Sequence, residues 1–143
     1  QSSLRAHTAA RFAARGIDPA RLRFDGFGSH ADTLRRYGAV SVALDPFPFN
    51  GCVSSCDALA MGVPVVALRG NSLVARQSAA LLHAIDCDDW VAADVDGYVE
   101  RACALASPPA NRAARARLGD RERLAIFDTA RFADELLAAI RAG

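Results

Sequence analysis

The chain has 143 residues, of which 52% are hydrophobic and 23% are charged, and its formal net charge is +1. A chain of this size can bury about 70% of its unfolded surface, enough for one compact domain. The small net charge gives no electrostatic reason to expect nucleic acid or membrane binding, and no apolar run reaches the roughly 18 residues of a membrane span. Four cysteines without a C-x-x-C pair argue against a zinc site and favour a cytoplasmic protein with reduced thiols.

The first third of the chain is predicted to alternate helix and strand. Apolar periodicity and turn residues predict a helix over Leu4–Arg15 that ends at Gly16, a strand over Leu22–Phe27, a helix over His30–Tyr37 and a buried strand over Val40–Leu44.

The same alternation continues to the C-terminus. We expect a helix over Cys56–Met61, a strand over Val63–Leu68, a helix over Val74–Ile85, a strand over residues 90–92 and helices over Val95–Ala106, Pro108–Gly119 and Thr129–Ala142. Alternating strands and helices predict an α/β fold, a Rossmann-like parallel sheet with helices on both faces. We interpret residues 1–143 as a single domain.

Residues 44–66, LDPFPFNGCVSSCDALAMGVPVV, form the most informative segment. A strand leads into a turn, and Ser54 and Ser55 stand where a helix is expected to begin. The first N–H groups of a helix lack internal partners, and the helix dipole favours an anion there. The small serines let a phosphate approach, and Asp57 can reach a sugar hydroxyl. The segment therefore indicates a nucleotide-type ligand.

Two of these residues also fit a purely structural interpretation. Ser54 and Asp57 match a capping box, in which the two side chains bond the N–H groups at the start of their own helix. A side chain engaged in capping is less free for a ligand, so the two interpretations compete. Asp45 lies at the carboxyl end of its strand, where open α/β sheets bind ligands. We favour a role for Asp45 in fixing the turn over Pro46–Phe49.

The segment also resembles a known signature. The blocks LD-x-FP-F-NG, CDAL and MGVPVV are similar to those of the bacterial TPR-containing, O-GlcNAc-transferase-like (SPINDLY-type) enzymes of glycosyltransferase family 41. The resemblance continues through residues 71–82 and 127–133 and covers roughly residues 21–140. It implies the C-terminal half of a GT-B fold that lacks its first β-α-β unit, as a fragment of a larger transferase. A sheet without its neighbouring strands exposes an edge, so self-association is also expected.

The resemblance implies an enzyme that transfers a sugar, GlcNAc from UDP-GlcNAc, to Ser/Thr of proteins without a cofactor or metal. Its partners would be the UDP-sugar donor, a protein acceptor and the remainder of the transferase, with its acceptor-side domain and TPR repeats. Two alternatives stay open. One is another nucleotide sugar, such as UDP-glucose or GDP-fucose, and the other is a catalytically silent nucleotide-binding or scaffolding module.

By the same resemblance the donor-binding residues are Gly28, His30, Thr33, Arg36, Val53, Ser54, Ser55 and Asp57, and no catalytic residue is assigned. Gly28 would contact the edge of uracil, His30 would replace a ribose-contacting lysine and Arg36 would lie near the base. Alternatively, His30 and Arg36 are solvated surface residues. The family usually has His at position 33 and Thr at position 53, so Thr33 and Val53 are departures that would weaken donor binding.

Overall fold

The structure is a computed structural model that describes residues 2–119 and 124–142. These residues divide into two compact units, one that ends at Ala31 and one that begins at Asp32, and each is described by itself. The first unit contains helix α1 (Ser2–Ala13) and the 3-10 turn η1 (Pro19–Arg21). Between them Gly16 has φ +76°, a conformation that glycine adopts without strain and that suits a helix end. The predicted first helix and its glycine stop are confirmed.

The predicted strand over Leu22–Phe27 is wrong. These residues are irregular, and none of them pairs with a strand among the described residues. The alternation of apolar and polar residues that suggested a strand does not lead to burial here, since Phe27 is 97% exposed. A strand of this length needs a neighbouring strand to bond its backbone groups, and the sequence pattern alone cannot supply one.

The second unit is built on a parallel sheet of three short strands in the order β1-β2-β3. They are β1 (Ala43–Leu44), β2 (Val65–Leu68) and β3 (Val91–Ala92), all shorter than the ranges expected from the sequence. Ala43 pairs with Val65, and Ala67 pairs with Val91. The predicted parallel α/β sheet is confirmed.

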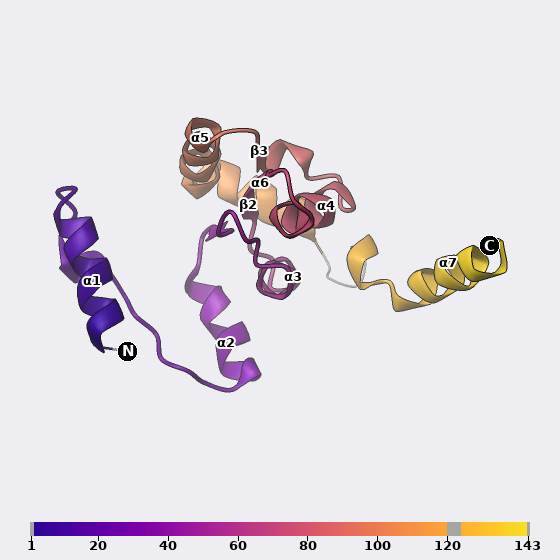
Figure 1. The fold of residues 1–143 in the computed structure, drawn as a ribbon, viewed down its shortest axis with the longest axis horizontal. Coiled ribbons are helices and arrows are strands. Elements are labelled where there is room, and N and C mark those ends of the chain that lie inside the picture. The colour runs from indigo at the N-terminus through magenta and orange to yellow at the C-terminus, as the bar shows by residue number, and fades with distance from the viewer. Residues whose placement is uncertain (1, 120–123, 143) are drawn as a thin grey trace. The chain divides into compact units, whose positions relative to one another are not determined.

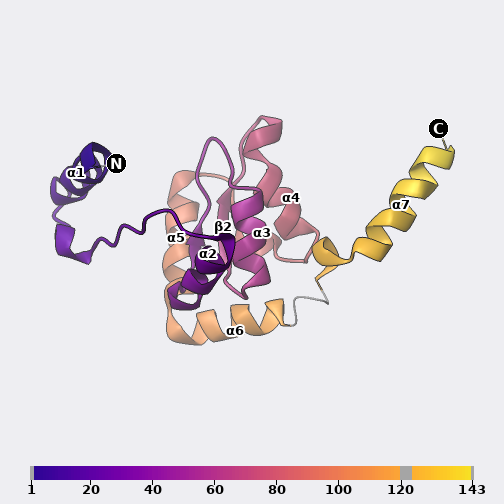
Figure 2. The same ribbon diagram turned by 90° about the horizontal axis from the view of Figure 1, so that it is seen from below.

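Helices lie on both faces of this sheet. The helices of the second unit are α2 (His30–Arg36), α3 (Val53–Ala60), α4 (Gln77–His83), α5 (Val95–Ala106), α6 (Pro108–Leu118) and α7 (Thr129–Ala142), with α2 beginning in the first unit and α7 contributing no buried residue. Helices α3 and α4 lie on one side of β2 and α5 lies on the other (Figures 1 and 2). No helix of the described residues is both long enough and apolar enough to cross a lipid bilayer.

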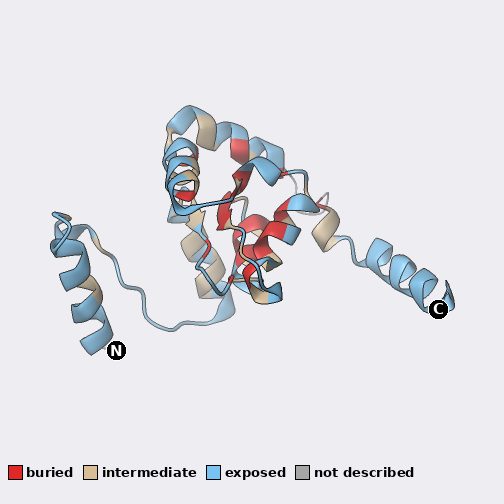
Figure 3. Cartoon of the chain, turned by 45° about the horizontal axis from the view of Figure 1, so that its top comes forward, coloured by how far each residue is buried: buried red, intermediate tan, exposed pale blue. Residues whose placement is uncertain are grey.

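The hydrophobic core surrounds β2. No residue described before Asp45 is buried, and α7 also contains no buried residue. The buried residues therefore concentrate in the sheet and in the helices that pack on it (Figure 3). The largest fully buried apolar side chains include Leu59, Val63, Val65, Val66, Leu82, Trp90 and Leu118. Burial of this apolar surface is the main favourable contribution to folding of the unit.

Helix α6 is bonded to the backbone beside the sheet. The Arg115 guanidinium donates to the Val40 carbonyl at 2.6 Å and to the Gly62 carbonyl at 3.1 Å. Asn111 Nδ2 donates to the Ser41 carbonyl at 2.7 Å. These bonds satisfy carbonyls at the approach to β1 and at the end of α3, so α6 holds both segments in place.

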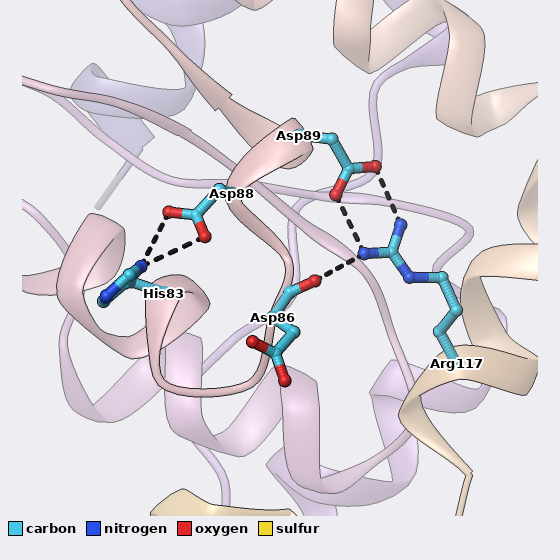
Figure 4. Close-up of polar contacts among 5 residues, drawn as sticks. All are labelled: His83, Asp86, Asp88, Asp89 and Arg117. Carbon is cyan, nitrogen blue, oxygen red and sulfur yellow. Dashed lines mark hydrogen bonds and ion pairs between the residues drawn. The ribbon is translucent and has the colours of Figure 1, made fainter.

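A second set of polar contacts joins α6 to the loop before β3. Arg117 forms a forked ion pair with Asp89, with N–O distances of 2.7 and 2.8 Å, and donates to the Asp86 carbonyl (Figure 4). His83 and Asp88 form a separate exposed pair at 3.0 Å. Within the described part of the chain, no cluster of three or more His, Cys, Asp or Glu side chains is arranged to hold a metal ion.

Candidate functional site

The candidate site lies at the carboxyl end of β1, where the chain turns into α3. Asp45 follows the strand directly, and its N–H still donates to the Val66 carbonyl of β2. Helix α3 begins at Val53, three residues before the Cys56 start expected from the sequence. This places Ser54 and Ser55 inside the first turn of the helix. The N–H groups of a first turn have no helical carbonyl four residues earlier to bond.

The capping-box interpretation of Ser54 and Asp57 is wrong. The residue at the N-cap position is Cys52, with φ 40° and ψ −88°, and its side chain forms no capping bond. Ser54 Oγ instead donates to the Gly51 carbonyl at 3.1 Å. Because the helix begins earlier than expected, Ser54 occupies a position too far into the helix to serve as its cap.

A buried carboxylate organises the turn before α3. Asp45 Oδ1 accepts hydrogen bonds from the Gly51 N–H at 2.8 Å and from the hydroxyls of Ser55 and Ser78 at 2.9 Å each. The two serine hydroxyls are 3.0 Å apart. We predicted that Asp45 fixes the turn over Pro46–Phe49; its carboxylate instead bonds Gly51, just after that turn, and the two helices α3 and α4.

The close packing at Gly51 explains why glycine occupies this position. A Cβ there would overlap Ser54 Oγ and would lie 3.1 Å from Asp45 Oδ1 and 3.2 Å from Ser55 Oγ. A larger residue would therefore have to displace the Ser54 hydroxyl and would crowd the Asp45 carboxylate and the Ser55 hydroxyl. Asn50 closes the same turn, since its Nδ2 donates to the Pro46 carbonyl at 3.2 Å.

The exposed side of α3 carries the residues that could meet a ligand. Val53 and Ser54 are exposed and Asp57 is half-buried, whereas Ser55 is buried with its hydroxyl in the Asp45 cluster. Direct contact between Ser55 and a ligand stays a prediction. Ser54 and Asp57 are three positions apart on a helix, and such residues share a face. The structure thus brings together a hydroxyl and a carboxylate at the start of α3.

Tyr37 is a neighbour of this face that the sequence did not indicate. Its hydroxyl donates to the Ser54 carbonyl at 3.0 Å. Burial raises the pKa of Tyr37, and the nearby negative charge of Asp57 raises that pKa further. Tyr37 therefore stays protonated and remains a donor at neutral pH. The pKa of the Cys56 thiol is also raised, by burial first and then by Cys52 and Asp57. No local sequence pattern signals the contact of Tyr37 with Ser54, because it joins residues 17 positions apart.

The remaining predicted residues lie on α2 and before it. Thr33 and Arg36 are half-buried residues of α2 in the second unit, and that part of α2 lies beside α3 in two views (Figures 1 and 2). Gly28 and His30 are exposed residues of the first unit. Their contribution to a ligand site stays a prediction.

A parallel sheet with helical crossovers and polar residues at the carboxyl end of its first strand is a Rossmann-like arrangement. Residues 4–136 match the model for glycosyl transferase family 41, and the chain belongs to that family. The chain is 32% identical, over 113 residues, to a protein of Petunia hybrida named a probable UDP-N-acetylglucosamine–peptide N-acetylglucosaminyltransferase SPINDLY. That match covers 77% of this chain and 12% of the petunia protein.

Two further similarities agree with this assignment. The protein of the same name from Solanum lycopersicum is 36% identical over 76 residues, which are 53% of this chain and 8% of that protein. The structure of a mutant O-GlcNAc transferase from Thermobaculum terrenum has a TM-score of 0.91 and 28% identity, and covers 99% of this chain and 28% of that one. The chain thus spans only about a tenth of the length of these two plant relatives.

Proposed function

We propose that this chain is the donor-binding part of a glycosyltransferase that moves GlcNAc from UDP-GlcNAc to Ser/Thr hydroxyls of proteins. The observation that carries the proposal is the helix face that the exposed Ser54 shares with the half-buried Asp57 at the start of α3, beside the carboxyl end of a parallel strand. Membership of family 41 supports it, as do the activities for which the petunia and tomato relatives are named.

The proposed role of α3 is to handle charge. As a glycosidic bond to a nucleotide diphosphate breaks, the leaving diphosphate gains negative charge. A helix N-terminus offers N–H groups and a positive dipole end to that charge without reorganisation. The Ser54 hydroxyl would bond the phosphate, and the Asp57 carboxylate would accept a hydrogen bond from a ribose hydroxyl. We expect this arrangement to bind a nucleoside diphosphate without a metal or cofactor.

We further propose that the parent protein is a bacterial, cytoplasmic transferase with TPR repeats and an acceptor-side domain. The signature in residues 44–66 supports this part, together with the small share of the relatives that the chain spans. Self-association through an uncovered sheet edge belongs to the same proposal. Sequencing the gene upstream of Gln1 tests this architecture. A gene that encodes neither TPR repeats nor a first catalytic half would contradict it.

Nucleotide choice is the direct test of the donor proposal. We expect the chain to bind UDP more tightly than ADP or GDP, since the resemblance assigns Gly28, His30 and Arg36 to uracil and ribose. Isothermal calorimetry with the three diphosphates measures this preference. Equal affinities, or a preference for GDP, would contradict the uridine assignment and would favour another nucleotide sugar.

A second candidate function is a catalytically silent nucleotide-binding or scaffolding module. Val53 favours it, because this apolar residue is 70% exposed at the first position of α3, where the family usually has a hydroxyl. The intact parent protein, incubated with labelled UDP-GlcNAc and a peptide library, separates the two candidates. Transfer to Ser/Thr peptides supports the enzyme, whereas nucleotide binding without transfer supports the silent module.

A further inference from the structure

Four buried polar side chains lie together under the first turn of α3. Asp45, Asn50, Ser55 and Ser78 are only 3%, 2%, 5% and 1% exposed. They come from the end of β1, from the following turn and from helices α3 and α4. The bonds to Asp45 Oδ1 therefore join three separate parts of the second unit at one oxygen atom.

Packing alone does not explain this cluster. The buried face of α3 consists of Ser55, Ala58 and Leu59, at the i, i+3 and i+4 spacing of a helix face. An alanine at position 55 would continue that face. Buried polar groups lose their hydration, and their replacement by apolar groups of the same shape is often nearly neutral for stability. Moreover, Asp45 Oδ2 is buried without a hydrogen-bond partner among the described residues.

The cluster does, however, determine how α3 presents its exposed side. Successive residues of a helix are about 100° apart, so Ser54 and Asp57 are separated by roughly 60° and both lie more than about 90° from Ser55. When Asp45 and Ser78 hold the Ser55 hydroxyl inward, Ser54 and Asp57 must face outward together. The bond from Gly51 to Asp45 meanwhile holds the backbone just before the helix begins.

We propose that Asp45 and Ser78 are positioning residues of the donor site. They act through Ser55 and Gly51, and they set the first turn of α3 so that Ser54 and Asp57 meet the ligand. In this account Ser55 is an anchor rather than a ligand contact. The identity of the ligand rests on the proposed function, whereas the positioning itself rests on the contacts around Asp45.

Ser78→Ala tests the proposal, because it removes one hydroxyl from a buried site without adding volume. We expect the variant to bind UDP about three- to tenfold more weakly, the fold-change that one net hydrogen bond supports. Amide hydrogen exchange in residues 53–57 should also become faster. The matched control is Ser107→Ala, whose hydroxyl donates to the Ala104 carbonyl at 2.8 Å at the end of α5. This control should change neither measurement.

Two variants of Asp45 separate positioning from simple support of the fold. Asp45→Asn keeps an acceptor oxygen for the same three donors, so it should bind UDP more tightly than Asp45→Ala. If Ser78→Ala lowers only the melting temperature and leaves both UDP affinity and exchange in residues 53–57 unchanged, the proposal is overturned. If the unmodified chain does not bind UDP, the proposed function fails, and the exchange comparison still decides whether Ser78 positions α3.

Discussion

At the scale of single residues, Asp57 and Val53 of α3 differ in the polar groups that they could offer to a ligand. Asp57 is half-buried beside Tyr37, and its charge contributes to the raised pKa of that tyrosine. Val53 has no polar group to offer, although it opens α3 and is exposed. In the proposed site, Asp57 would therefore meet a sugar hydroxyl, whereas Val53 leaves the expected phosphate without one hydroxyl.

Restoring that hydroxyl should improve binding. Val53→Thr adds an O–H donor at the first position of α3, and a bond to a charged phosphate contributes about 1.5–3 kcal/mol at best. We expect UDP affinity to rise several-fold with little change in melting temperature, as measured by calorimetry and thermal unfolding. Val95→Thr is the matched control, since Val95 is the exposed first residue of α5. Equal effects of both changes on UDP affinity would contradict the assignment of position 53 to the site.

The ion pair between Asp89 and Arg117 should make the fold sensitive to acid. The hydrogen bond from Arg117 holds the pKa of Asp89 below its ordinary value of 3.8. As the pH falls, Asp89 takes up a proton in the unfolded chain before it does so in the folded chain. The ion pair therefore contributes to stability above about pH 4, and this contribution is lost as the pH falls through the lowered pKa of Asp89 in the folded chain. Because both groups are largely exposed, solvent screens the pair, and we expect about 0.2–1 kcal/mol.

Asp89→Asn removes this contribution. The free energy of unfolding, measured by urea titration between pH 2 and pH 6, should therefore depend less steeply on pH in the variant than in the unmodified chain. Asp134→Asn, on the exposed helix α7, is the control and should leave the pH dependence unchanged. If the unfolding free energy of Asp89→Asn and of the unmodified chain falls equally with pH between pH 6 and pH 2, the ion pair contributes nothing measurable.

At the scale of elements, local patterns predicted most helices but could not predict where α3 begins. The hydroxyl residues Ser54 and Ser55 suggested a start at Cys56, because serines are common at helix caps. The actual start at Val53 follows a turn in which Asp45 bonds Gly51, six positions away, and Ser78, 33 positions away. Sequence rules for helix ends do not include such distant contacts.

The end of α3 is, in contrast, a local feature that sequence rules predict well. Gly62 has φ +68°, and a Cβ there would meet no atom within 4 Å. Gly62→Ala should therefore cost about 1 kcal/mol of unfolding free energy through backbone strain alone. Gly38→Ala is the matched control, because a Cβ at Gly38 also meets open space and its φ is not in the left-handed region. Chemical denaturation that finds the two variants equally stable would contradict this account.

At the scale of the whole molecule, the sequence predicted the parallel sheet correctly because helices connect β1 to β2 and β2 to β3. It failed at Leu22–Phe27, where the apolar pattern suited a strand but no neighbouring strand is present among the described residues. Gly28 and His30, which are predicted to contact the donor, belong to that first unit, whereas Ser54 and Asp57 belong to the second. Periodicity identifies elements, but it does not show which distant residues meet.

The central claim is that the start of α3 recognises a nucleoside diphosphate through Asp57. The most direct measurement is the calorimetric affinity for UDP of the unmodified chain and of Asp57→Asn, which keeps the shape and removes the charge. Asparagine still accepts a hydrogen bond but without the charge that strengthens it, so UDP binding should weaken several-fold, with little change in melting temperature. Asp96→Asn, at an exposed position of α5, should bind UDP as the unmodified chain does. An Asp57→Asn variant with unchanged UDP affinity and a lowered melting temperature would contradict the claim, since Asp57 would then serve only the fold.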